Sequence, residues 1–243
     1  MIYTDELSEG VLRITLNRPD VLNAINWEML SQIEETVDRI SVDDSYRVVL
    51  FAGNGDRAFC AGADLKVVRE LDSNGLDRWT TTGHRVLDKI RNLPQISVAS
   101  IHGYCLGGGL ELALSCDMRI ARKDAQFGFP EITNGWIPGW GGVPLLTRAI
   151  NYSQAVAMLF LGDRIGSIKA NDCGLVVNVF ESDDIEYSVK TIVERLANHS
   201  PPAVTYLKSA LSLNNPDSVA ANSSFESEIL CSLLSGQANE TDD

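Results

Sequence analysis

The stretch IHGYCLGGGLELALSCD, residues 101–117, places three consecutive glycines directly before an apolar segment with helical character. Glycine destabilises a helix interior by about 1 kcal/mol relative to alanine, so these glycines need a separate reason. A helix N-terminus exposes unpaired N–H groups with a partial positive charge, and glycine lets a ligand approach that backbone closely. Residues 107–109 therefore either present amides to an oxygen that becomes negative, or allow a tight strand-to-helix turn to pack closely.

The segments around this stretch alternate between strand and helix patterns. Strands are predicted at residues 11–17, 47–53, 96–103, 118–123 and 175–180, and helices at 27–40 and about 77–91. This rhythm is typical of an α/β unit with parallel strands. Beyond residue 152 the patterns are mostly helical, at about 153–162, 183–200, 201–212 and 218–235. The sequence therefore predicts an α/β core at residues 1–162 and a helical C-terminal part at residues 163–243.

Composition and charge exclude several classes of function. The 243 residues include 33 acidic and 20 basic side chains, and the net charge of −13 is the wrong sign for a protein whose main partner is nucleic acid or an anionic membrane. The five cysteines lack any CxxC spacing and the three histidines lie far apart, so neither a disulfide framework nor a metal site is predicted. The acidic N-terminus does not resemble a signal peptide, and we expect a soluble cytoplasmic protein.

A second segment, DRAFCAGADLK at residues 56–66, offers another exposed amide. Its small residues leave the backbone N–H of Ala61 accessible at the end of an apolar run. Two such N–H groups from separate segments, aimed at one point, would form an oxyanion hole, in which each donor contributes about 3 to 4 kcal/mol of transition-state stabilisation.

A third segment, AQFGFPEITNGWIPGWGG at residues 125–142, holds an acid among apolar residues. Glu131 lies near Phe127, Phe129, Ile132 and Trp136, where desolvation favours the protonated form of a carboxyl group. Such a group is a usable acid near neutral pH. The alternative interpretation is a solvated glutamate on a loop.

In this order and spacing, the motifs AFCAGADLK, IHGYCLGGGLELALSCD and FGFPEITNGWIPGWGG resemble the enoyl-CoA hydratase/isomerase (crotonase) superfamily. The opening ITLNRPDVLNAIN, residues 14–26, is similar to the N-terminal signature of that family. The resemblance implies a repeated ββα spiral core with a helical C-terminal part used for trimerisation. It also implies a homo-oligomer, a trimer or a hexamer. The chain stops at GQANETDD, where relatives continue into one more helical segment, so we expect either a naturally short chain with a more exposed acyl pocket or a missing end.

The resemblance further implies an enzyme that binds an acyl-CoA thioester and stabilises its enolate, without a metal or an organic cofactor. By this resemblance the oxyanion hole comprises the N–H groups of Ala61 and Gly108. Glu111 and Glu131 occupy both glutamate positions of the hydratase branch, as base and acid around one water, and the backbone N–H of Gly139 also holds that water. The expected reaction is hydration of a 2-enoyl-CoA to a 3-hydroxyacyl-CoA. A double-bond isomerase and a catalytically idle assembly subunit are the alternatives.

Binding of coenzyme A, as part of the substrate, is implied for two segments. The expected substrate-binding residues are Val21, Leu22, Ala24, Gly62, Ala63, Asp64, Leu65, Lys66, Gly139 and Trp140. Arg18 and Lys66 either contact the CoA phosphates or are solvated surface cations. The bulk of Trp136 and Trp140 either shortens or reshapes the acyl site, or belongs to core packing.

Overall fold

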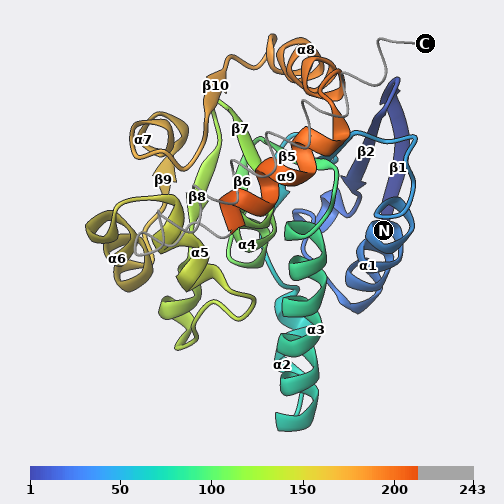
Figure 1. The fold of residues 1–243 in the computed structure, drawn as a ribbon. Coiled ribbons are helices and arrows are strands. Elements are labelled where there is room, and N and C mark those ends of the chain that lie inside the picture. Colours follow the sequence, from blue (N-terminus) through green and yellow to red (C-terminus); the bar gives the residue numbers. More distant parts are fainter. Residues whose placement is uncertain (213–243) are drawn as a thin grey trace, which may run out of the picture. The chain divides into compact units, whose positions relative to one another are not determined.

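The computed structural model describes residues 1–212, coloured along the chain in Figure 1. The chain divides into two compact units, residues 1–197 and residues 198–243, of which the second is described only to residue 212, where it contains helix α9 (Pro201–Ser212). Residues 163–197, assigned above to the C-terminal part, belong to the first unit. The helix predicted at 218–235 lies outside the described residues.

The main sheet of the first unit has six strands in the order β1-β2-β3-β5-β7-β10. Their bounds are β1 (Ile2–Ser8), β2 (Val11–Leu16), β3 (Val48–Gly53), β5 (Ile96–Ile101), β7 (Met118–Arg122) and β10 (Asn178–Phe180). All neighbours pair in parallel except β1 and β2, which form an antiparallel pair. The parallel arrangement of the five predicted strands is therefore confirmed, whereas the sequence analysis missed β1.

A second, smaller sheet has the order β4-β6-β8-β9. Its strands are β4 (Ala58–Cys60), β6 (Tyr104–Leu106), β8 (Gln126–Gly128) and β9 (Ile165–Gly166). Three times along the chain, a strand of the main sheet is followed directly by a strand of the smaller one, as β3-β4, β5-β6 and β7-β8. The α-helices or 3-10 helix that follow each pair complete the repeated ββα pattern expected of this fold.

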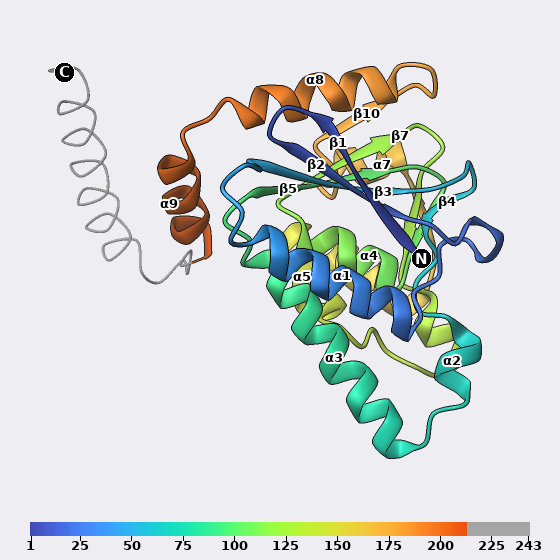
Figure 2. The same cartoon turned by 90° about the vertical axis from the view of Figure 1, so that its right-hand side faces the viewer.

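Helices cover both faces of the main sheet, as Figure 2 shows. One face is covered by α8 (Ile185–Ala197), and α1 (Trp27–Ile40) and α4 (Gly108–Ser115) lie beneath the other. Alternate residues of β3 serve the two sides, since Val49 and Phe51 pack in the cluster that contains α1, and Val48 and Leu50 in the cluster that contains α8. Burial on both faces explains why this strand is an unbroken apolar run.

The remaining helices continue the alternation along the chain. They are η1 (Pro19–Val21), α2 (Leu65–Arg69), α3 (Ser73–Arg91), η2 (Pro130–Asn134), α5 (Gly142–Ala149), α6 (Tyr152–Leu161) and α7 (Ser167–Asp172). Helix α6 ends at Gly162 in a left-handed conformation with a φ of 66°, as the sequence predicts. Within residues 1–212, no helix combines the length and the apolar character that a membrane span requires.

Candidate active site

Glu111 is a carboxylic acid buried in the first turn of α4. It is 2% exposed, and every residue of the helix is buried. Its Oε1 accepts hydrogen bonds from the backbone N–H of Trp140 at 2.7 Å and of Gly142 at 2.8 Å. Burial raises the pKa of Glu111 to about 7, the two amides oppose this shift, and the charge of Glu131 adds to it. The loop before α5 therefore fixes the position of this acid and keeps its ionised form accessible near neutral pH.

Glu131 is the second acid, and it lies in the 3-10 helix η2 directly after a buried phenylalanine, Phe129. Its Oε1 lies so near the turn before α4 that a Cβ built on Gly107 would be 2.6 Å from this oxygen. Its Oε2 is buried and has no hydrogen-bond partner within the described part of the chain. Desolvation raises the pKa of Glu131 to about 7. The interpretation as a solvated loop glutamate is therefore wrong.

Two backbone amides from separate segments lie beside these acids. Gly108 is the first residue of α4, so its N–H precedes the first hydrogen bond within the helix, from the N–H of Glu111 to the carbonyl of Gly107 at 2.9 Å. A Cβ built on Gly108 would lie 3.4 Å from the amide nitrogen of Ala63. Neither amide donates a hydrogen bond to another described residue. Ala63 and Gly108 thus form a pair of free donors.

The prediction that Ala61 supplies one of these donors is wrong. The N–H of Ala61 donates to the carbonyl of Leu22 at 3.0 Å and is already used in the fold. Gly62 lies between the two alanines with a φ of +103°, so the backbone turns there and the two amides face different neighbours. The glycine itself was the available signal, because only its conformation decides which alanine faces the loop before α4.

The three glycines have different local roles, and close packing at a strand-to-helix turn is confirmed for two of them. A Cβ on Gly109 would overlap the carbonyl oxygen of Cys60, so this glycine allows α4 to pack directly on β4. Gly107 has a φ of +49° and gives the turn that begins the helix. The amide of Gly108 has no acceptor among the described residues, and its contact with a negative oxygen remains a prediction.

The segments expected to bind coenzyme A are joined by backbone hydrogen bonds. The N–H of Ile25 donates to the carbonyl of Gly62, and the N–H of Asp64 donates back to the carbonyl of Ile25, both at 2.8 Å. Asn23, fully buried, donates to the carbonyls of Asn54 and Ala58 and holds this turn in place. The expected contacts of Val21, Leu22, Ala24, Gly62, Asp64, Leu65 and Lys66 with CoA remain predictions.

The two cations considered for the CoA phosphates differ in their surroundings. Arg18 donates to the carbonyl of Ala24 at 2.6 Å and to Asp64 at 2.9 Å, with 17% of its side chain exposed, so it acts as a structural crosslink. Lys66 is exposed at the start of α2 and has no ion pair with another described residue. Lys66 is therefore the candidate of the two for contact with a phosphate.

Trp140 fills the space beside the free amides. It is 2% exposed, and a Cβ built on Gly108 would lie 2.7 Å from Cζ3 of its indole ring. The ring also packs against Trp79 of α3, with centroids 5.1 Å apart. A substrate contact is predicted here from the family resemblance, whereas the hydrogen bonds that the Trp140 and Gly142 amides donate to Glu111 were not predicted. A backbone contact of this kind leaves no signal in residue type.

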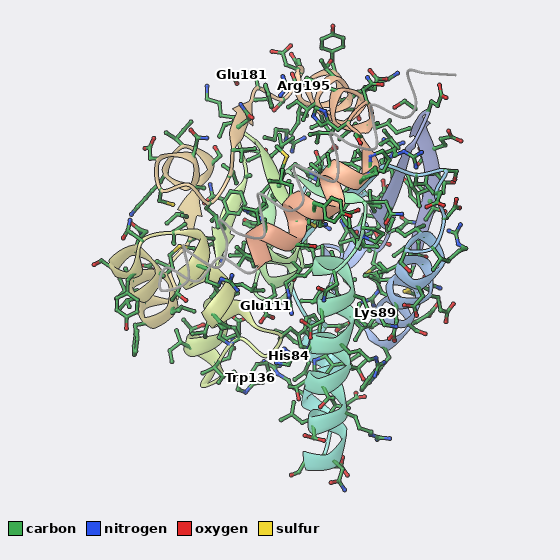
Figure 3. The ribbon with its side chains drawn as sticks, viewed as in Figure 1. His84, Lys89, Glu111, Trp136, Glu181 and Arg195 are labelled. Atoms are coloured by element: carbon green, nitrogen blue, oxygen red, sulfur yellow. The ribbon has the colours of Figure 1, made fainter. Side chains whose placement is uncertain are left out.

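Figure 3 shows Glu111 on α4 alongside α3, the helix that carries His84, with Trp136 on the loop after η2. His84 is exposed, and a Cβ on Gly141 would lie 3.8 Å from its Cε1. A cavity of about 730 Å³, lined by residues that include Thr15, Ser100 and His102, contains neither glutamate. Among residues 1–212, no cluster of three or more His, Cys, Asp and Glu side chains could hold a metal ion.

The structure thus brings together a parallel core, two free backbone amides and an adjacent pair of acids with raised pKa values. Comparison with known proteins identifies the family. The model of the enoyl-CoA hydratase/isomerase family matches residues 6–240, and the chain belongs to that family.

Relatives of this family are similar over most of the chain. The short-chain-enoyl-CoA hydratase of Clostridium acetobutylicum is 32% identical over 215 residues, which cover 88% of this chain and 82% of the relative. The 2,3-dehydroadipyl-CoA hydratase of Escherichia coli is 38% identical over 204 residues, which cover 84% of this chain and 78% of the relative. The crystal structure of an enoyl-CoA hydratase from Bacillus anthracis superposes with a TM-score of 0.91 at 32% identity, covering 94% of this chain and 89% of that one.

Proposed function

We propose that the protein hydrates a 2-enoyl-CoA to the 3-hydroxyacyl-CoA, with the pair Glu111 and Glu131 acting on one water molecule. The observation that carries this proposal is the position of two acids, each with a pKa of about 7, beside the free amides of Ala63 and Gly108. The hydratases among the relatives support the same reaction.

The thioester carbonyl oxygen accepts hydrogen bonds from the Ala63 and Gly108 amides, which stabilise the negative charge that develops when the double bond is attacked. Ionised Glu111 takes a proton from water while the hydroxyl oxygen bonds to C3. Protonated Glu131 then gives its proton to C2. Since two neighbouring carboxylates repel each other, the state with one proton on the pair dominates near pH 7, as this reaction requires.

The first test follows the loss of conjugated thioester absorbance with crotonyl-CoA. Glu131→Gln should lower kcat by roughly 100- to 10,000-fold, because the amide has no acidic proton to give to C2. Glu70→Gln, at an exposed glutamate on the end of α2, is the matched control and should retain full activity. Full activity of Glu131→Gln would contradict the assignment of the acid.

Isotopically labelled water separates hydration from the alternative reaction. Hydration places the solvent oxygen in the product, whereas a double-bond isomerase incorporates only solvent hydrogen. An unlabelled product with a shifted double bond would identify an isomerase. Inactivity of the folded chain with every enoyl-CoA tested would favour the idle assembly subunit.

The proposed reaction needs no metal and no organic cofactor, because the charge is handled by backbone amides and the protons by carboxyl groups. Dialysis against a chelator should therefore leave the rate unchanged. A loss of activity that Zn²⁺ or Mg²⁺ restores would contradict this part of the proposal.

We also propose a homo-oligomer, a trimer or a hexamer, located in the cytoplasm. Support for the assembly comes from large apolar side chains exposed on α6 and α7, namely Phe160 at 74%, Leu161 at 63% and Ile168 at 57%. Cys60, Cys105 and Cys173 form no disulfide bond among the described residues, which is consistent with a reducing compartment. Light scattering coupled to size exclusion measures the assembly directly.

A further inference from the structure

We infer that the indole of Trp140, clamped between Gly83 and Gly108, forms a wall of the acyl pocket and restricts the substrate to short acyl groups such as crotonyl. This inference rests on the proposed function and specifies its substrate class. It assigns to the Trp140 side chain a role separate from that of the Trp140 amide, which holds Glu111.

The indole lies directly at the amide that would bind the thioester oxygen. A Cβ built on Gly108 would be 2.7 Å from Cζ3 of Trp140, 3.0 Å from Cε3 and 3.4 Å from the amide nitrogen of Ala63. The benzo edge of the ring and the two donors therefore border the same small volume. A thioester whose carbonyl oxygen accepts from both amides therefore has its acyl carbons close to the benzo edge of Trp140.

The ring cannot move aside easily, because both of its ends are enclosed. A Cβ on Gly83 in α3 would overlap Nε1, Cε2 and Cδ1 of Trp140, so that helix approaches the pyrrole side at van der Waals distance. Trp79, on α3 like Gly83, packs against the indole of Trp140. Trp27 packs edge-on against Trp79, with ring centroids 4.8 Å apart. Only 2% of Trp140 is exposed, so the indole fills the space between α3 and Gly108.

The side chain and the backbone of Trp140 have separable effects. Any residue other than proline at this position retains the N–H that Glu111 accepts, so a smaller side chain opens space without removing the support of the base. Removal of an indole leaves room for many methylene groups, and even one methylene in an apolar pocket changes selectivity by about tenfold or more.

The test compares kcat/KM for crotonyl-CoA and 2-decenoyl-CoA. We expect the unmodified protein to prefer crotonyl-CoA, and Trp140→Ala to raise the ratio of decenoyl to crotonyl by at least about tenfold. Trp140→Phe, which keeps most of the packing, should give a smaller rise in the same direction. Tyr187→Ala, at an aromatic residue on α8 that is 78% exposed, is the control and should leave the ratio unchanged. An unchanged ratio in a folded Trp140→Phe and Trp140→Ala would overturn the inference.

A second pair of variants tests the clamp. Gly83→Ala should lower kcat/KM for crotonyl-CoA, because the new methyl group pushes the indole toward Gly108. Combination with Trp140→Ala should remove this defect, since the methyl group then meets no ring. If Gly83→Ala lowers kcat/KM by the same factor with Trp140 present as with Trp140→Ala, Gly83 does not hold the indole in place.

Binding separates a failure of this inference from a failure of the proposed function. If no enoyl-CoA is hydrated, calorimetry with saturated butanoyl-CoA and decanoyl-CoA still reports the size of the pocket. Tighter relative binding of decanoyl-CoA after Trp140→Ala supports the wall whatever the reaction. Equal relative binding before and after the substitution contradicts it.

Discussion

At the scale of single residues, the site depends on two carboxyl groups kept in apolar surroundings. Glu111 is held by two amides, whereas Glu131 has a buried Oε2 without a partner in the described chain. For Glu131 the burial is therefore a cost to folding whenever the group is ionised. The burial that raises the pKa of Glu131 therefore also lowers the stability of the folded protein when the group is ionised. Such an opposition is common at functional sites.

This opposition predicts how stability changes with pH. The pKa of Glu131 rises from 4.5 in the unfolded chain to about 7 in the folded protein, so the folded state binds the proton more tightly. The tighter proton binding stabilises the folded state fully below about pH 4.5, and this stabilisation is lost as the pH rises through 7. It amounts to at most about 3 kcal/mol of unfolding free energy. Glu131→Gln should thus raise the free energy of unfolding relative to the unmodified protein at pH 8, and not at pH 4.5. Urea unfolding at both pH values, with Glu70→Gln as control, measures this difference, and the opposite sign would contradict the desolvation of Glu131.

The sequence predicted both glutamates, since a lone acid in an apolar helix and another after a proline stand out from their neighbours. It did not predict which alanine faces Gly108, because the φ of Gly62 decides the direction of each amide. The glycine at position 62 signals a possible turn in the sequence, but the sequence does not give the value of φ. Arg18 similarly carried a charge suited to phosphate, and only the coordinates pair it with Asp64.

At the scale of elements, α4 connects the two sheets to the site. Gly109 allows the helix to lie directly on the carbonyl of Cys60 at the end of β4. At the other end of α4, Arg119 donates to the carbonyls of Cys116, Ala113 and Leu175. The helix is therefore fixed at both ends, and the amide of Gly108 is fixed with it.

Gly109→Ala should destabilise the protein by about 2 to 4 kcal/mol, because the added methyl group overlaps a backbone oxygen that cannot rotate away. Gly166→Ala is the matched control, since its φ of −78° suits alanine and its nearest neighbour would be a flexible glutamine at 3.5 Å. Thermal unfolding of both variants checks the prediction. Equal melting temperatures would show that α4 can shift away from β4.

Most of the longer elements were predictable from the sequence, although the seven-residue strand β1 was missed. Strands β2, β3, β5 and β7 lie in apolar runs and helices α1, α3 and α8 show helical periodicity, whereas the three-residue strand β10 lies at the end of the predicted run 175–180. Strands β4, β6 and β8 have three residues each, too few to show a period of two, and their pairing comes from the spiral path of the chain. The second sheet was therefore expected only from the family resemblance.

At the scale of the whole molecule, an acidic protein is proposed to bind an anionic substrate. The net charge of −13 would repel coenzyme A at long range, whereas the contact predicted for Lys66 would act only at short range. Salt screens distant charges before close ones, since the Debye length falls from about 30 Å at 0.01 M to about 8 Å at 0.15 M.

We therefore expect kcat/KM for crotonyl-CoA to rise roughly threefold over this range of ionic strength. A crotonyl thioester of a short uncharged thiol is the control and should show no such rise. Lys66→Gln should lower kcat/KM for the CoA thioester and leave that for the uncharged thioester unchanged. A fall with salt for crotonyl-CoA would show that local cations dominate over the net charge.

The hydrogen bonds to Glu111 come from the main-chain amides of Trp140 and Gly142. The donors proposed for the thioester oxygen, on Ala63 and Gly108, are also main-chain amides. The reactive geometry is thus encoded in the path of the polypeptide, and the side chains along that path can diverge while the chemistry persists. The same feature makes the loop before α5 intolerant of changes in length. Deletion of one residue between Pro138 and Gly142 would remove no acid, yet it would shift the register of the amides and leave Glu111 without its donors.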